Sequence, residues 1–230
     1  MIIPLGFFKK TVSGSYPAYV DNGGYATNVG TDNTTLDISN STVVDADDIL
    51  IMHLYVSEDA TAFTHTGWTE ADIVIGHLDR TNVIMWKRAV GNEDATDETV
   101  DIDFGASRTA KGIIYRFSGC VDTGTPIEVV AASSIGTNTG SNLSINPTGN
   151  STGNNRLATI FYWHTDNVGV TDNTTGYTQE YFEAIDEQAD HTFAVYSEEI
   201  PTSTDDDGNV ELITGTSETN SYTGFYLIPA

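Results

Sequence analysis

The sequence predicts an all-β protein, built as an antiparallel, jelly-roll-like β-sandwich with an internal pseudo-twofold repeat. Three observations predict it: short apolar runs with the period of strands, turn-forming residues between these runs, and a second half that repeats the first. Of the 230 residues, 39% are hydrophobic and 10% aromatic, enough for a substantial core. We expect residues 1–30 to be an N-terminal leader or docking segment. Residues 31–230 are expected to form a single sandwich of two related halves, about 31–120 and 135–230.

The repeat consists of six short blocks that recur in the same order. The separation is 107 residues between Leu36 and Leu143 and 110 residues between Trp86 and Tyr196. Because the order is kept and the spacing is nearly fixed, the two halves are expected to share one β architecture. The paired blocks are Leu36-x-Ile38 with Leu143-x-Ile145, Ile49–Tyr55 with Leu157–Trp163, Gly67-Trp68-Thr69 with Gly176-Tyr177-Thr178, Val83–Trp86 with Phe193–Tyr196, Val100-x-Ile102 with Val210-x-Leu212, and Ile113–Phe117 with Phe225–Ile228.

The expected strands follow from the local pattern along the chain. Ile49–Tyr55 and Val83–Trp86 are continuous apolar runs, typical of strands buried on both faces, whereas Thr99–Phe104 alternates as a half-exposed strand does. Residues 133–140 are expected to link the halves, and residues 180–189 are compatible with one short helix. Turns are expected at Thr66-Gly67, Gly105-Ala106-Ser107, Asn154-Asn155 and Asp206-Asp207-Gly208-Asn209.

The charge of the chain excludes two classes of partner. There are 33 acidic and 9 basic residues, which gives a formal net charge of −24 and a pI near 4.1. A chain this acidic repels nucleic acid and anionic membrane surfaces, so we expect neither as a partner. The charge suits a protein that stays soluble at high local concentration or in salty water, and an acidic proteome is the alternative explanation.

The N-terminal sequence predicts a protein made in the cytoplasm, and the single cysteine adds little to this. Cys120 is the only cysteine, so we expect a small buried side chain and neither an intrachain disulfide nor a cysteine metal site. Residues 1–10 lack the form of a signal peptide, and no stretch has the length of a transmembrane helix. If the chain leaves its cell, we expect it to do so by lysis or on a particle.

One acidic loop is a candidate calcium site. It carries several oxygen ligands around Gly208 but lacks the twelve-residue spacing of an EF-hand. The alternative is a hairpin turn whose aspartates face water. No other cofactor is expected. The candidate ligands are Asp205, Asp207, Asn209 and Glu211.

The remaining acidic and histidine residues give no further metal site. Asp45, Asp47 and Asp48 are expected to form a solvated strand entry, with a metal site as the less favoured alternative. The five histidines show no zinc-binding spacing, and His53, inside an apolar strand, is expected to be a core or interface side chain that corresponds to Phe161 in the second half.

Aromatic side chains are the candidates for ligand binding. Trp68 and Tyr177 occupy matching places in the two halves, and sugar-binding proteins stack pyranose rings on such side chains. The alternative is that these rings pack in the core, as aromatic residues of β-sandwiches do. An enzyme is not expected, because the sequence has no nucleophile elbow, no phosphate-binding loop and no distinctive pair among its 33 acidic residues.

The order of several short motifs resembles a known family. The motifs are Gly67-Trp68-Thr69, Trp86-Lys87-Arg88-Ala89-x-Gly91-x-Glu93, Ile114-Tyr115-Arg116-Phe117-Ser118-Gly119-Cys120 and the closing Phe225–Ala230. This order is similar to that of β-sandwich proteins of bacteriophage particles, found among tail, fibre and capsid-decoration components. The resemblance covers about residues 36–230, and its most specific element is the block from Trp86 to Glu93.

The resemblance implies a non-enzymatic structural protein of a virion, displayed on the particle surface as a capsid decoration or as a tail or fibre component. Its implied partners are other virion proteins and copies of itself, in a homo-oligomer such as a trimer. It transfers no catalytic residue and no cofactor. The alternative function is a glycan-binding adhesin module that recognises a host surface. The strong acidity and residues 1–30 depart from the family pattern.

Overall fold

The fold is given by a computed structural model. Every regular element in its described residues is a β-strand, and all strand pairings are antiparallel, which confirms the predicted fold class. In this part of the chain no helix is long and apolar enough to cross a membrane. The structure describes residues 16–30, 34–57, 63–64, 66–75, 80–94, 96–102, 108–139, 143–145, 153–165, 171–172, 176–185, 191–202, 210–213 and 217–230.

The first half forms a larger and a smaller sheet. Its strands are β1 (Ala18–Asn22), β2 (Ala26–Gly30), β3 (Thr34–Ser39), β4 (Ile49–Val56), β5 (Phe63–Thr64), β6 (Thr69–Ile75), β7 (Thr81–Arg88), β8 (Asp97–Ile102) and β9 (Arg108–Ser118). The larger sheet has the order β1-β9-β4-β7-β6, and β2 also pairs with β9. The smaller sheet has the order β3-β8-β5.

The second half repeats this arrangement. Its strands are β10 (Ile127–Thr139), β11 (Leu143–Ile145), β12 (Arg156–His164), β13 (Thr171–Asp172), β14 (Thr178–Ile185), β15 (His191–Ile200), β16 (Val210–Ile213) and β17 (Ser217–Leu227). The larger sheet has the order β10-β17-β12-β15-β14, and the smaller sheet has the order β11-β16-β13. Strands β11–β17 therefore take the places of β3–β9, and β10 takes the place of β1 and β2.

Unusual backbone conformations also recur at equivalent positions. Asp47 lies two residues before β4 and Asn155 lies one residue before β12, with φ angles of 72° and 57°. Gly67 and Gly176 precede β6 and β14, with φ angles of 90° and 85°. Positive φ is uncommon for residues other than glycine, and asparagine and aspartate tolerate it best. The same turns therefore open the same strands in both halves, which supports the predicted repeat.

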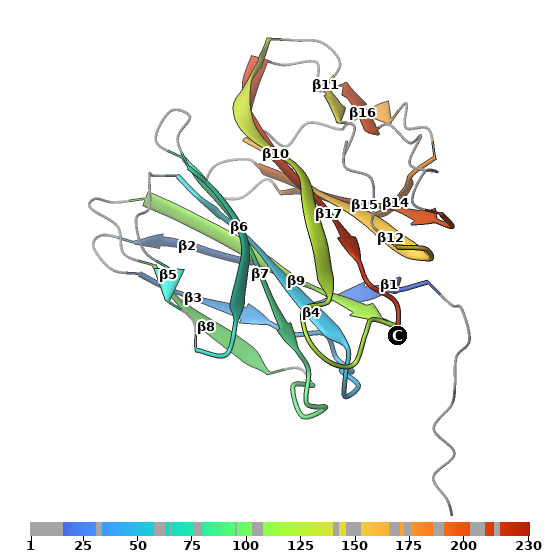
Figure 1. The fold of residues 1–230 in the computed structure, drawn as a ribbon. Helices are drawn as coiled ribbons and strands as arrows, with labels where there is room; N and C mark the ends of the chain where they lie inside the picture. The colour runs from blue at the N-terminus through green and yellow to red at the C-terminus, as the bar shows by residue number, and fades with distance from the viewer. Residues whose placement is uncertain are drawn as a thin grey trace, which may run out of the picture.

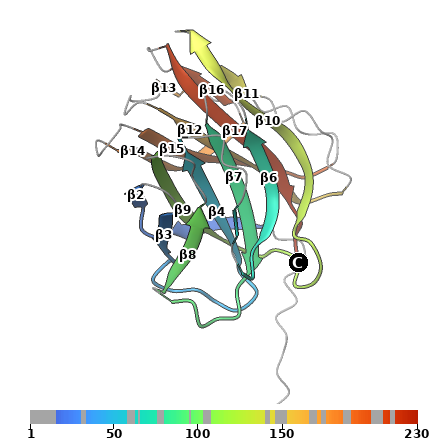
Figure 2. The same ribbon diagram turned by 90° about the vertical axis from the view of Figure 1, so that its left-hand side faces the viewer.

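The four sheets lie in four layers with three hydrophobic cores between them (Figures 1 and 2). Each smaller sheet packs on the larger sheet of its own half and makes an outer core. The two larger sheets face each other and make a central core to which both halves contribute. The first outer core includes Leu36, Met52 and Val100, the second includes Ile160, Tyr196 and Val210, and the central core includes Ile51, Tyr115, Phe161 and Phe225.

The continuous apolar runs are explained by this layering. Every residue of β4 is buried, and Leu50, Met52 and Leu54 face the outer core while Ile51 and Tyr55 face the central core. Side chains alternate between the two faces of a strand, so a strand between two cores needs apolar residues at every position. The expectation that this strand is buried on both faces is confirmed.

In one block the alignment of the halves predicted from the sequence is wrong by one residue. Trp86 packs against the central core, whereas Tyr196 lies in the second outer core. The strand register gives the correct equivalent, because Thr69 pairs with Trp86 and Thr178 pairs with Ser197. A shift of one residue moves a strand side chain to the opposite face. Ser197, and not Tyr196, takes the place of Trp86.

Three boundaries expected from the sequence also differ from the structure. Residues 18–22 and 26–30 of the expected leader are strands β1 and β2 of the first larger sheet. Residues 133–139 of the expected linker belong to β10, and residues 180–185 of the possible helix belong to β14. Pairing with a neighbouring strand satisfies backbone groups whatever the side chains are, so it overrides weak local propensities.

Candidate functional site

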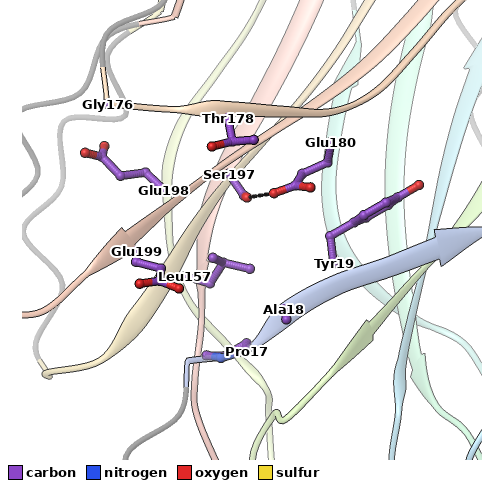
Figure 3. A pocket seen from close by; sticks show the side chains of 10 residues that line it. All are labelled: Pro17, Ala18, Tyr19, Leu157, Gly176, Thr178, Glu180, Ser197, Glu198 and Glu199. Carbon is purple, nitrogen blue, oxygen red and sulfur yellow. Dashed lines mark hydrogen bonds between the residues drawn. The ribbon is translucent and has the colours of Figure 1, made fainter.

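A pocket of about 380 Å³ lies where the first half of the chain meets the second (Figure 3). One wall is the start of β1, with Pro17, Ala18 and Tyr19. The opposite wall comes from β12, β14 and β15 of the second half. The pocket size is within the range of about 300–1,000 Å³ that is common for ligand sites. Both halves are thus needed to build it.

The pocket lies where polar residues replace apolar ones at two places of the repeat. Ser197 takes the place of Trp86. Glu180 takes the place of Ala71, because Glu180 and Ala71 are each the extra residue of a β-bulge in their strands. Trp86 and Ala71 pack against the central core. Ser197 and Glu180 line the open space instead, where the Ser197 hydroxyl donates a hydrogen bond to the Glu180 carboxylate (Figure 3). Bulges commonly redirect a side chain in this way.

Tyr19 closes one side of the pocket in a fixed and neutral form. Its ring packs edge-on against Phe117, with centroids 5.7 Å apart, and its hydroxyl donates to Asn22 Oδ1 at 2.8 Å. Burial, with the nearby charges of Asp21 and Glu180, raises the pKa of Tyr19 to about 12. The phenol therefore stays protonated at neutral pH and supplies an apolar ring surface to the pocket.

The electrostatic character of the pocket is acidic. Among the described residues, its lining includes the carboxylates Glu180, Glu198 and Glu199 and no basic side chain. Ala18, which is exposed, and the partly buried ring of Tyr19 add apolar surface. A group of carboxylates attracts cations and repels anions. The pocket is therefore suited to a ligand that carries both a positive charge and an apolar part.

Trp68 and Tyr177 occupy equivalent places, as predicted, but they are used for packing. Tyr177 is only 7% exposed and belongs to the second outer core, so its ring offers no face on which a sugar could stack. Trp68 is partly buried against the first outer core. Its indole N–H donates to Glu98 at 3.3 Å, and the Lys87 ammonium lies 5.3 Å from its ring centroid. The structure thus fits the core-packing alternative for both rings.

The block from Trp86 to Glu93 holds the turn that follows β7. The Glu93 carboxylate accepts hydrogen bonds from the backbone N–H groups of Val90, Gly91 and Asn92, at 3.0, 2.9 and 3.0 Å. Gly91 has a φ of 81°, which lets three successive N–H groups converge on one carboxylate. Lys87 lies 3.9 Å from Glu93 and also pairs with Glu98. The motif residues are therefore architectural.

The acidic cluster at the entry to β4 is also structural. Arg116, which is 7% exposed, donates to Asp48 at 2.5 Å and to Asp45 at 2.8 Å. It also donates to the backbone carbonyl of Val43 at 2.6 Å. Asp48 is buried, so the expectation of a fully solvated cluster is wrong for this residue. The aspartates bind the guanidinium of β9 and fix the loop that precedes β4.

The candidate calcium loop lies mostly outside the described residues. Asp205, Asp207 and Asn209 lie outside the described residues, and Glu211 lies in β16, where its backbone pairs with Ser144. Within the described part of the chain, no group of three or more histidine, cysteine or acidic residues is arranged to hold a metal ion.

His53 and Cys120 are core residues, as the sequence predicts. His53 is fully buried, its Nε2 lies 2.7 Å from Asn82 Oδ1, and Asn82 Nδ2 donates to Thr223 Oγ1 at 3.4 Å. This short polar chain joins the two larger sheets across the central core. Cys120 is 4% exposed, and burial raises the pKa of its thiol to about 12, so the thiol is not activated.

The sequence alone did not indicate the pocket. Glu198 and Glu199 gave no signal among so many acidic residues. Glu180 and Ser197 are polar where the first half has the apolar residues Ala71 and Trp86. This difference could have indicated the pocket, but it can be recognised only when the strand register is known. No protein-family model, curated protein or solved structure matches the chain.

Proposed function

We propose that the chain is a non-enzymatic structural protein of a bacteriophage particle, displayed on the capsid or at the tail. The observation that carries the proposal is the use made of the motif residues. The resemblance rests on the Trp86–Glu93 block and on the segment around Arg116. The side chains of both segments make hydrogen bonds that hold strands and turns together. Residues that hold strands and turns together serve shape and stability, which suits a particle component.

The distribution of charge supports display at a surface. The described basic side chains are all buried or partly buried; they are Arg80, Lys87, Arg88, Lys111, Arg116 and Arg156. Exposed carboxylates include Asp37, Asp45, Asp47, Glu70, Asp94, Asp97, Asp122 and Glu199. The outside of the body is therefore strongly acidic, which keeps crowded copies from associating nonspecifically and leaves contact to defined sites.

The proposed partners are other virion proteins and further copies of the chain. A rigid four-layer body is suited to symmetric display, and closed homo-oligomers such as trimers are common in such assemblies. If the chain forms a trimer, light scattering coupled to size-exclusion chromatography gives a mass three times 24.8 kDa. A monomer mass at high concentration would contradict the trimer and leave the particle assignment to be judged by microscopy.

The proposal is tested by immunogold electron microscopy of particles released by the producing culture, with an antibody against this chain. We expect gold label on capsids or tails, and its position separates decoration from a tail component. A preimmune antibody on the same grids is the control. Unlabelled particles with label on cells or in free solution would contradict the proposal and favour a glycan-binding surface module.

A further inference from the structure

We infer that the pocket between β1, β14 and β15 binds the N-terminal segment Phe7–Lys10 of the same chain. The bound segment would place its lysines against Glu180, Glu198 and Glu199 and its phenylalanines against the apolar wall. This inference goes beyond the proposed function, because it concerns a contact within one chain whichever particle or surface holds it.

Charge complementarity is the first argument. The part of the pocket lining that the structure describes has three carboxylates and no basic side chain. Of the nine basic residues, six are buried or partly buried within the body. Only Lys9, Lys10 and Arg108 remain. Arg108 is at the end of β9 that pairs with Gly30, whereas β1 pairs at the other end, around Ser118. Ten residues of strand separate these ends, or about 33 Å, so the lysines are the cations left for the pocket.

The place where the chain enters the body is the second argument. Pro17 and Ala18 line the pocket, so the residues before them start at its rim. Lys10 precedes Pro17 by seven residues, and an extended chain of that length spans about 24 Å. Ser13-Gly14-Ser15 lies between them and consists of residues that favour chain reversal. A tethered segment has an effective concentration in the millimolar range, which favours the pocket of its own chain over that of a second copy.

The chemistry of the segment matches the pocket walls. Phe7 and Phe8 can bury ring surface against Ala18, which is exposed, and against the partly buried Tyr19 ring. The ammonium groups meet carboxylates that lie on β14 and β15, of which Glu199 is exposed and the others are partly buried. Ion pairs at such a site are modest and are screened by salt. Docking is therefore expected to be reversible and to weaken at high ionic strength.

Limited trypsin proteolysis of the intact chain tests the inference. Trypsin cuts after Lys9 and Lys10, and mass spectrometry gives the rate at these bonds. The test variant is E180Q/E198Q/E199Q, and the matched control is D47N/E70Q/D122N, which changes the charge equally at exposed positions outside the pocket. We expect the pocket variant to be cut faster, by about two- to fivefold for each carboxylate removed, and the control to match the wild type.

Three further readouts make the result decisive. The wild-type rate at Lys9 and Lys10 should rise in 0.5 M NaCl more than that of a synthetic peptide of residues 1–16. The wild-type cutting rate should not depend on protein concentration. A rate that rises on dilution would show that the segment docks on a second copy, and it would overturn docking within one chain. Chymotrypsin, which cuts after Phe7 and Phe8, should cut the K9Q/K10Q variant faster than the wild type after correction by the corresponding peptides.

Equal cutting rates for the pocket variant and the control variant would overturn the inference. Far-UV circular dichroism and the thermal midpoint establish that each variant is folded. If the triple variant does not fold, the single change E199Q at the exposed carboxylate gives the same test with a smaller expected effect. The outcome is independent of where the chain is found by immunogold microscopy.

Discussion

Tyr55 and Trp163 occupy equivalent positions in the two halves, and their ring centroids lie 4.2 Å apart in the central core. His53 and Phe161 are a second equivalent pair in contact, with centroids 6.0 Å apart and planes at 82°. Contact between equivalent residues is the property of an isologous, twofold interface. The two halves therefore associate as the subunits of a symmetric dimer do, although they belong to one chain.

The Tyr55–Trp163 contact is expected to be a main source of stability. We expect W163A to lower the free energy of unfolding by about 3–5 kcal/mol, because it leaves a large cavity in the central core. In a double-mutant cycle with Y55A, the coupling between the rings should be about 0.5–1.5 kcal/mol. Urea denaturation followed by circular dichroism measures both quantities. V90A, at a side chain that is 71% exposed, is the control, and an equal loss in V90A would contradict the prediction.

The ion pair of Arg116 with Asp48 predicts that a single variant loses more stability than the double variant. R116M leaves Asp48 buried without its cation, so we expect it to cost about 3–5 kcal/mol of unfolding free energy. D48N/R116M removes both charges and should cost less than R116M alone. Chemical denaturation at pH 7 compares the three proteins. If the double variant is the less stable one, the cost comes from lost packing and not from an unpaired charge.

The Glu93 turn predicts a loss of stability in acid. Burial tends to raise the pKa of Glu93, but the N–H groups of Val90, Asn92 and Gly91 and the charge of Lys87 outweigh it and hold the pKa below its usual value of 4.5. The stabilisation is therefore complete above pH 4.5 and is lost as the pH falls below it. We expect E93A to cost about 1–3 kcal/mol at pH 7. The difference from the wild type should shrink between pH 4.5 and pH 3, as measured by denaturation at each pH, and a constant difference would contradict the role of the carboxylate.

The buried His53 predicts that the unfolding free energy depends on pH in a range above that of Glu93. Burial lowers its pKa from 6.5 to about 3, and the hydrogen bond to Asn82 opposes this only in part. A folded-state pKa below the unfolded value means that the stabilisation is complete above pH 6.5 and is lost as the pH falls toward 3. This one group contributes a slope of up to about 1.4 kcal/mol per pH unit.

The variant H53Q isolates this contribution, because glutamine does not titrate but keeps a hydrogen-bonding group for Asn82. We expect the unfolding free energy of H53Q to depend less on pH than that of the wild type between pH 6.5 and pH 5, a range above the window of Glu93. Denaturant titrations at pH 7, 6 and 5 measure the difference. Parallel pH profiles for the two proteins would show that protonation of His53 is not linked to unfolding.

The fold class, the repeat and most of the strands could be predicted from the amino-acid sequence. Alternation and turn residues are local, so runs such as Ile49–Tyr55 could be assigned without knowing their partners. The places of Trp68 and Tyr177 after equivalent glycines could be assigned for the same reason. The sequence also determined that Cys120 and His53 are core residues, because each lies in or beside an apolar strand.

The register between the halves, and with it the pocket, depends on how the folded sheets pack together. Ser197 is the equivalent of Trp86 in the first half, and this equivalence depends on which residues of β14 and β15 pair. The partners of Glu93 and Arg116 likewise lie in a turn and in a distant loop. Strand faces alternate at every residue, so a one-residue change in register reverses them, and pairing between distant strands is set by packing of the whole core. For that reason the site could be read only from the assembled sheets.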